Sequence, residues 1–338
     1  MKKVSFSQKI RAHIITLPRP FAFPFFASSL LLGVVLAGGT FNLTTITGLI
    51  AGLLIVAGGH SFNSYLDYAW TGLDKGEKED RSAEKAYTGG QNLIENGIVT
   101  INEVLFNALF WYLAAFVLLL TMVSSVGWMV VVWGILGMLD TLWYSWSKFN
   151  WTHELALSFG VGPCATMIGM YSVTSNPDWI RGILTSIPLC FIFAWAGLAL
   201  DEWPDAEANL KKGVKSMAYM VWKCAQMTLD YPENIKQWRS ETVEERTTWA
   251  YSDAIWVKDI NVLRWYISFW FLTAYIFQVA LIAAGYLNRF TIISFLVLPF
   301  ILVCLVFLKD DFKKAAGYLV TVAAFYPILV LLGQWAGG

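Results

Sequence analysis

Charged residues are scarce in this chain. Only 14% of its 338 residues are Asp, Glu, Lys or Arg, whereas a soluble domain carries about 25%. The 24 basic and 24 acidic residues cancel, so no excess of positive charge predicts binding to nucleic acid. Scarce charge, together with a composition that is 57% hydrophobic, indicates an integral membrane protein.

Cysteine is rare as well, and no CxxC pair occurs. Three of the four cysteines lie in apolar runs, and we interpret them as packing residues; the four are Cys164, Cys190, Cys224 and Cys304. The N-terminal stretch has no small-residue cleavage site after a short apolar core. It predicts a basic, partly amphipathic lead-in rather than a removed signal peptide.

What the chain has in abundance is apolar runs of the length that a membrane helix needs, about 20 residues. Pro163, Pro188 and Pro299 fall inside such runs, as is typical of membrane helices. The sequence therefore predicts an all-α integral membrane protein with about nine transmembrane helices. The runs lie near residues 21–39, 44–66, 103–123, 127–147, 154–174, 181–200, 262–285, 289–308 and 315–336.

Lys and Arg positions predict the orientation. With the N-terminus in the cytoplasm, 22 of the 24 basic residues lie on the cytoplasmic side, and only Arg181 and Arg289 lie outside. The odd number of spans then places the C-terminus outside. Two inner connections are long, 67–102 and 201–261, and long loops in compact proteins are functional or disordered. We interpret both as ordered cytoplasmic cap loops.

A polar cluster ends the second run, in the stretch GGHSFNSYLDYAWTGLD. At 100° per residue, His60, Asn63, Asp67 and Asp74 point the same way if the helix continues that far. Carboxylates near a helix C-terminus oppose the helix dipole, so their repetition suggests a bound cation. Oxygen ligands from Asn and Asp suit Mg²⁺. His60 contacts a substrate or is a hydrogen-bonded histidine of the bundle.

A second acidic cluster ends the sixth run. Asp201 and Asp205 are one helical turn apart and share a face, and they emerge on the same side of the membrane as the first cluster. Two groups of carboxylates at one depth repel unless cations lie between them. The basic residues that follow, Lys211, Lys212 and Lys215, suit a Mg²⁺-diphosphate ligand, because metal bridges acid to phosphate and Lys binds the remaining oxygens.

At these two motifs the chain resembles the UbiA superfamily of intramembrane prenyltransferases. The motifs NSYLD (Asn63–Asp67) and DEWPD (Asp201–Asp205) match that family's NxxxD and DxxxD motifs at the ends of its second and sixth helices. The resemblance implies one UbiA-like transmembrane domain over residues 1–338, with helices surrounding a central cavity. Finer similarity in NSYLDYAWTGLD, RSAEKAYTGGQNLIENGIVT and EWPDAEANLKKGVKS points to the branch that prenylates 1,4-dihydroxy-2-naphthoate in menaquinone biosynthesis.

The resemblance implies transfer of a polyprenyl group from its diphosphate to an aromatic acceptor, in a membrane such as the prokaryotic plasma membrane. It implies Mg²⁺ held by Asn63, Asp67, Asp201 and Asp205, with Asp74 as a further carboxylate. It also implies three basic residues for the diphosphate and a tyrosine that contacts the diphosphate or the developing cation. These four are Arg81, Lys148, Lys215 and Tyr144.

An acid inside the fourth run needs a separate interpretation. Asp140 lies one turn before Tyr144 and two turns before Lys148, and an ionisable residue within a span is a functional hypothesis by default. It binds an acceptor hydroxyl, accepts the departing proton, or forms a structural pair with Lys148 or a Ser/Thr hydroxyl. His153 and Glu154, at the start of the fifth run, are further candidates for acceptor contact.

Other functions remain open at this point. A secondary transporter also uses intramembrane acids, although transporters place them near the midplane in repeated halves, and here they cluster at one face. A different acceptor is the alternative within enzymes: 4-hydroxybenzoate, homogentisate, a chlorin, haem or a glycerol phosphate lipid. A purely structural scaffold leaves the paired acidic clusters unexplained.

Overall fold

The structure is a computed structural model of the chain, and it describes residues 4–75, 93–203, 209, 212–218 and 260–337. All of its regular secondary structure in these residues is helical. The elements are α1 (Phe6–Arg11), η1 (Ala12–Thr16), η2 (Pro20–Ala22), α2 (Phe23–Leu36), α3 (Leu43–Ala69), α4 (Ile101–Val126), α5 (Met129–Ser147), α6 (His153–Phe159), η3 (Gly160–Cys164), α7 (Ala165–Tyr171), α8 (Trp179–Cys190), η4 (Phe191–Gly197), α9 (Leu198–Glu202), α14 (Ile260–Ala283), η5 (Arg289–Val297), α15 (Leu298–Phe307) and α16 (Phe312–Ala336).

The all-α membrane class predicted from the sequence is confirmed. Seven helical stretches in the described residues are long and apolar enough to cross a membrane. The two other predicted spans coincide with α2, which has 14 residues, and with the consecutive segments α6, η3 and α7. Seven of the nine predicted spans therefore correspond to helices long enough to cross a membrane, and the predicted count of nine is not confirmed.

Local signals fix where the second and third spans begin. The side chain of Asn42 accepts a hydrogen bond from the backbone N–H of Thr45, and the Thr45 hydroxyl accepts one from the backbone N–H of Asn42, so this pair starts α3. Thr100 and Glu103 form the same reciprocal pair at the start of α4. These pairs satisfy N–H groups that have no partner inside the helix.

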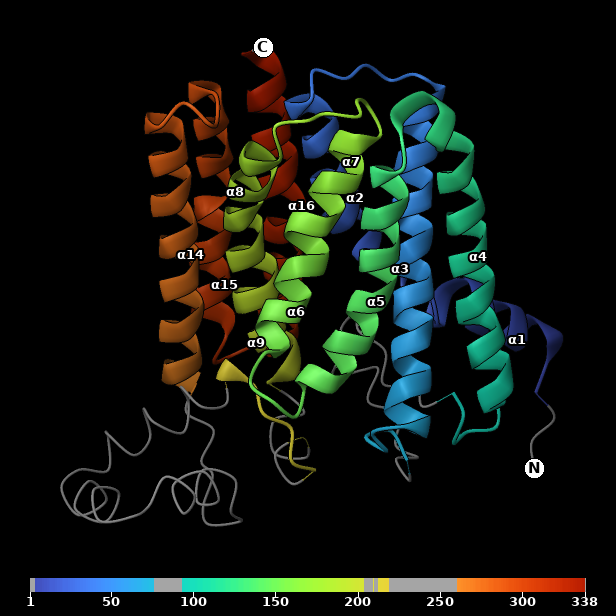
Figure 1. The fold of residues 1–338 in the computed structure, drawn as a ribbon. Coiled ribbons are helices and arrows are strands. Elements are labelled where there is room, and N and C mark those ends of the chain that lie inside the picture. The colour runs from blue at the N-terminus through green and yellow to red at the C-terminus, as the bar shows by residue number, and fades with distance from the viewer. Residues whose placement is uncertain (1–3, 76–92, 204–208, 210–211, 219–259, 338) are drawn as a thin grey trace, which may run out of the picture.

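The helices stand roughly side by side, and the carboxyl ends of α3 and α9 lie at the same end of the bundle (Figure 1). α3 packs against α4 and α5, while α14 packs against η4 and α8. α2 contacts α3, α7 and α16, so it joins the first helices of the chain to the last. This arrangement brings the two predicted acidic motifs to one end.

Two glycines permit a close crossing of α2 and α7. A Cβ at Gly33 would lie 2.0 Å from the carbonyl oxygen of Thr166, and a Cβ at Gly169 would lie 1.9 Å from the carbonyl oxygen of Leu30. No side chain fits at these distances, so the backbones contact each other directly, as is common for small residues at membrane helix interfaces. The crossing fixes α2 against the middle of the bundle.

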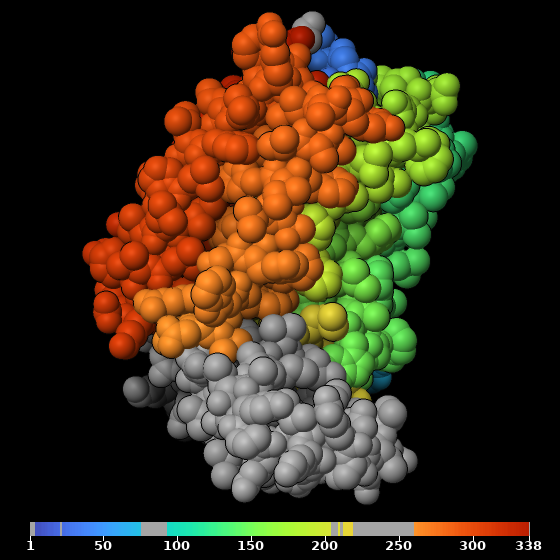
Figure 2. All heavy atoms as spheres, turned by 90° about the vertical axis from the view of Figure 1, so that its left-hand side faces the viewer, coloured from blue at the N-terminus to red at the C-terminus, as the bar shows by residue number. Residues whose placement is uncertain are grey.

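The outer surface of the C-terminal helices is apolar, as expected for a face in contact with lipid. Figure 2 shows the face built by α14, η5 and α15. Trp265, Leu272 and Ile276 on α14, and Leu302 and Val306 on α15, are all more than half exposed. An apolar surface of this extent is stable in hydrocarbon and would be a liability in water.

The α2–α7 crossing leads to a stability prediction. We expect Gly169→Ala to lower the thermal stability of the detergent-solubilised protein by about 1–3 kcal/mol, because the new methyl group forces two backbones apart. Gly317→Ala is the matched control: it lies on a helix, and a Cβ there meets nothing within 4 Å. Thermal unfolding of the two variants measures the difference, and equal melting temperatures would contradict the direct backbone contact.

Candidate active site

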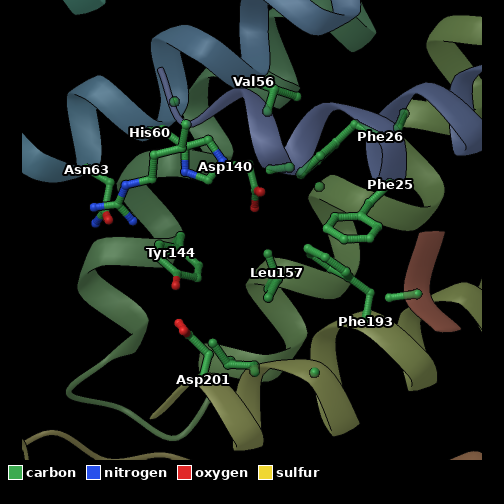
Figure 3. Close-up of a pocket in the computed structure, with 18 of the residues that line it drawn as sticks. Phe25, Phe26, Val56, His60, Asn63, Asp140, Tyr144, Leu157, Phe193 and Asp201 are labelled. Atoms are coloured by element: carbon green, nitrogen blue, oxygen red, sulfur yellow. The ribbon is translucent and has the colours of Figure 1, made fainter. Parts of the chain in front are cut away.

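A cavity of about 230 Å³ opens within the bundle, between α2, α3, α5, the α6–α7 segment, η4–α9 and α16. Figure 3 shows Asn63, Asp140, Tyr144 and Asp201 around one space, although they come from three different helices. Most of the remaining wall is apolar. Five of the residues singled out in the sequence line this cavity: His60, Asn63, Asp140, Tyr144 and Asp201.

Asp67 does not line the cavity itself but is tied to residues that do. Its Oδ2 lies 2.6 Å from Lys148 Nζ and accepts a hydrogen bond of 3.0 Å from Asn63 Nδ2. The side chains of Lys148 and Asp67 are only 12% and 10% exposed, so this is a buried ion pair. Breaking such a pair leaves an uncompensated buried charge and is strongly destabilising.

The same helices are joined one turn deeper. Asn63 Nδ2 also donates to Ser145 Oγ at 3.0 Å. Because residue numbers rise together in the pairs Asn63–Ser145 and Asp67–Lys148, α3 and α5 run in the same direction and in a fixed register. The i, i+4 spacing of Asn63 and Asp67 on α3 places both on the side of α3 that faces α5.

Tyr144 stands between the ion pair and the next helix. Its ring centroid is 5.2 Å from Lys148 Nζ and 4.4 Å from the ring centroid of His153. A cation above a tyrosine ring is attracted by the ring face. Tyr144 therefore lines the cavity, as predicted, and the positive charge of Lys148 lies on one side of its ring.

A buried polar group lies behind Tyr144. His153 is fully buried, and its Nδ1 lies 3.2 Å from Ser147 Oγ while its Nε2 lies 3.1 Å from Glu202 Oε1. Glu154 is buried as well, and its Oε1 accepts a hydrogen bond from the backbone N–H of Ala218 at 3.2 Å. The contact between His153 and Glu202 joins α6 to α9, next to Asp201.

The sequence did not single out Glu202, although it stands beside Asp201. Glu154 does not line the cavity: its hydrogen bond holds the segment that follows Lys215. Lys215 is half-buried, and its backbone N–H donates to the carbonyl of Lys148 at 2.5 Å. This contact places Lys215, within the second predicted cap loop, against the end of α5.

Asp74 does not share a helix face with Asn63 and Asp67, because α3 does not continue as far as residue 74. α3 ends at Ala69, and Gly72 adopts a φ of +71°, which turns the chain. Asp74 is nevertheless near Asp67, because its backbone N–H donates to the Asp67 carbonyl at 3.2 Å. Arg81 and Asp205, predicted for the diphosphate and the metal, lie outside the described residues.

Arg19 lines the cavity and was missed in the sequence, where it counted only toward the orientation. Its backbone is left-handed, with a φ of 50°, and its Nη2 lies 3.5 Å from Ser64 Oγ on α3. The segment before it is anchored to α4, because Asn107 Nδ2 donates to the carbonyl of His13 at 3.1 Å. The sequence feature that could have identified Arg19 is its position immediately before Pro20, where the first span begins.

The oxygen ligands at the cavity mouth fit a hard divalent cation. Asn63 uses its amide nitrogen for two hydrogen bonds, and its Oδ1 accepts none from the described residues. Asp201 adds a carboxylate from the other side of the same cavity. No group of three or more His, Cys, Asp or Glu that could hold a metal occurs among the described residues, and Asp205 is not one of these residues.

Comparison with known proteins shows the family to which this chain belongs. A sequence model of the UbiA prenyltransferase family matches residues 26–226, more than half of the chain. The chain belongs to the UbiA prenyltransferase family. UbiA family members are prenyltransferases, so the protein is an enzyme rather than a transporter, and the family in general uses divalent metal ions to bind diphosphate.

Two solved structures share the fold of this UbiA protein. The apo structure of a UbiA homolog from Aeropyrum pernix K1 superposes with a TM-score of 0.61 at 14% identity, covering 92% of this chain and 96% of that chain. A structure described as digeranylgeranylglyceryl phosphate synthase in membranes gives a TM-score of 0.50 at 12% identity, covering 97% and 98%. No curated protein sequence gives a significant match.

The contact behind Tyr144 leads to a second prediction. In a double-mutant cycle of His153→Leu and Glu202→Gln, we expect a coupling free energy of about 1–3 kcal/mol, because both side chains are buried. The matched pair Lys9 and Glu103, at 2.8 Å, has side chains that are 44% and 35% exposed, and its cycle should give at most about 1 kcal/mol. Thermal unfolding of both cycles checks this, and equal coupling in the two pairs would contradict it.

Proposed function

We propose that this UbiA protein catalyses Mg²⁺-dependent transfer of a polyprenyl group from polyprenyl diphosphate to 1,4-dihydroxy-2-naphthoate, a step of menaquinone biosynthesis. The observation that carries the proposal is that Asn63, from the first motif, and Asp201, from the second, line one cavity. The choice of acceptor rests on the resemblance of the NSYLDYAWTGLD and EWPDAEANLKKGVKS stretches to that branch of the family.

The diphosphate belongs at the motif end of the cavity. Mg²⁺ bound there would neutralise the charge of the diphosphate and stabilise it as the leaving group. Asn63, Asp67, Asp201 and Asp205 would hold the metal, with Asp74 in support. Arg19 and Lys148 would bind the remaining phosphate oxygens, joined by Arg81 and Lys215 from the two cap loops.

The prenyl tail belongs in the apolar part of the cavity, and the aromatic side chains there suit the reaction. Phe193 packs against Phe25 and Phe26, with ring centroids 4.6 and 6.2 Å apart, and all three line the cavity. As the allylic C–O bond loosens, positive charge develops on the prenyl carbon, and aromatic ring faces stabilise a cation. The Tyr144 ring would do this nearest the diphosphate.

The aromatic carbon of the acceptor then attacks the cationic carbon and loses a proton. Asp140 and His60, both in the cavity wall, are two groups that can hold this proton or bind the acceptor. Glu154, buried outside the cavity, would act on the acceptor only through the segment it holds. The loops 67–102 and 201–261 would cover the cytoplasmic mouth, with the N-terminus in the cytoplasm and the C-terminus outside.

A second acceptor class has an observation in its favour. The structure described as digeranylgeranylglyceryl phosphate synthase shares the fold over nearly the whole of both chains. A glycerol phosphate lipid is therefore the first alternative to the naphthoate, ahead of 4-hydroxybenzoate, homogentisate, a chlorin or haem.

The acceptor is tested by incubating the purified protein with Mg²⁺, prenyl diphosphates of several lengths and the acceptors named above. We expect a product whose mass equals the naphthoate plus one prenyl group, with diphosphate released only when Mg²⁺ is present. A product formed only from the glycerol phosphate lipid would replace the naphthoate as acceptor. Release of no diphosphate with any acceptor would refute the transferase proposal.

The metal ligands are tested by Asp67→Asn and Asp201→Asn. We expect each to lower kcat at least about 100-fold, because each removes a negative charge from the metal site. Asp67→Asn also leaves Lys148 without its buried counterion and should lower the melting temperature, so turnover is measured at a temperature at which both variants are folded. Glu103→Gln is the matched control: it removes a carboxylate at the start of α4 and should leave turnover unchanged. Wild-type turnover by both aspartate variants would refute the metal assignment.

A further inference from the structure

Asp140 is an acid at the wall of the cavity, and it has no hydrogen-bond partner among the described residues. Its Oδ1 is buried and accepts no hydrogen bond from the part of the chain that the structure describes. Figure 3 shows its carboxylate pointing into the cavity. Burying an acid within a membrane protein without a hydrogen-bond donor costs free energy. Such an acid is therefore a candidate for binding a ligand that supplies the donor.

The structural partners expected from the sequence are engaged elsewhere. Lys148, two turns along α5, pairs with Asp67 at 2.6 Å, so the predicted alternative of an Asp140–Lys148 pair is wrong. The hydroxyl of Thr141, the next residue, lies 2.9 Å from Tyr112 Oη on α4. The neighbouring hydroxyl of α5 therefore already has a partner, and the donor for Asp140 is missing from the described protein.

The fold makes room for this carboxylate. A Cβ on Gly160, in η3, would lie 2.5 Å from Asp140 Oδ2. Any larger side chain at this position would therefore push the carboxylate out of its place. Gly160 also lines the cavity, so the space beside Asp140 opens toward a ligand.

Neither part of a prenyl diphosphate can supply the missing donor. The prenyl chain has no hydrogen-bond donor, and the diphosphate oxygens are acceptors that belong with Lys148 and Arg19. Asp140 lies four residues before Tyr144 and eight before Lys148 on one helix, about 6 and 12 Å deeper along the axis. A carboxylate on the acceptor cannot donate either, whereas a hydroxyl or an amine of the acceptor can.

We propose that Asp140 and Gly160 form a hydrogen-bond-accepting subsite that selects acceptors with a hydroxyl group at this depth of the cavity. The inference rests on the proposed function for the presence of an acceptor. It goes further by assigning recognition of the acceptor hydroxyl to one residue. Among the candidate acceptors, it favours phenols and alcohols over a haem or a chlorin that presents only carboxylates.

The test compares binding of two acids that differ only in their hydroxyls, 1,4-dihydroxy-2-naphthoate and 2-naphthoate, to the full-length protein in detergent with Mg²⁺ and inorganic diphosphate, which carries no prenyl group to transfer. We expect the wild type to bind the dihydroxy compound about 10- to 100-fold more tightly, since leaving a buried polar group without its hydrogen-bond partner costs about this much in affinity. Asp140→Ala should bring the two affinities together by weakening only the dihydroxy compound. The pair 4-hydroxybenzoate and benzoate repeats the comparison with one hydroxyl.

Gly160→Ala, which keeps the acid but displaces it, should also reduce the preference for the dihydroxy compound. In the Asp140→Ala background the same glycine change should cause no further loss, and Gly317→Ala serves as the neutral control. A wild type without preference for the hydroxylated member of either pair, or an Asp140→Ala variant that keeps the preference, would overturn the proposal.

A second measurement, which needs no acceptor, tests whether Asp140 has a structural role instead. If the acid has no protein partner, Asp140→Asn should leave the melting temperature of the ligand-free protein unchanged or raise it. A lower melting temperature would show that the protein itself satisfies Asp140 and would overturn the proposal. Because these readouts are binding and stability, failure of prenyl transfer in the acceptor panel would refute the proposed function separately.

Discussion

The buried ion pair between Asp67 and Lys148 is the interaction on which the site depends. It joins α3 to α5, and with the Asn63–Ser145 hydrogen bond it fixes the register of two helices that run in the same direction. The Asp67 side chain is largely withdrawn from water, so the lysine supplies its counterion. A metal ion that binds at Asp67 would therefore replace one positive partner by another instead of neutralising a bare acid, and would release Lys148 toward the diphosphate.

The cavity changes character along its length. At the motif end, Asn63, Asp201 and Arg19 surround it with charge and amide groups, whereas Phe25, Phe26 and Phe193 make the deeper part aromatic and apolar. A prenyl diphosphate has the same division, with a charged head and a hydrocarbon tail. Asp140 is an exception to this gradient, and that exception is why we assign it to the acceptor rather than to the prenyl donor.

Sequence reasoning predicted the fold class and the convergence of the two motifs, because apolar run length and Lys/Arg placement are set by the membrane itself. It placed Asn63, Tyr144 and Asp201 at one site on the basis of helix ends and family motifs. It missed Arg19, because that residue reaches the cavity through a left-handed backbone turn that no periodicity reveals. It also missed Glu202, whose contact with His153 joins helices distant in the sequence.

Two wide helical turns interrupt the helices around the cavity: η3 over Gly160–Cys164 and η4 over Phe191–Gly197 are π-helical. A π turn contains more residues than an α turn, so each one rotates everything that follows it about the helix axis. Asp201 lies in α9, the short helix that follows η4 directly, so its direction depends on that rotation. Loss of one residue from 191–197 would turn the acid by about 100°, away from the cavity, while the hydropathy of the span stayed the same. The length of this segment, as well as its composition, therefore determines whether Asp201 faces the cavity.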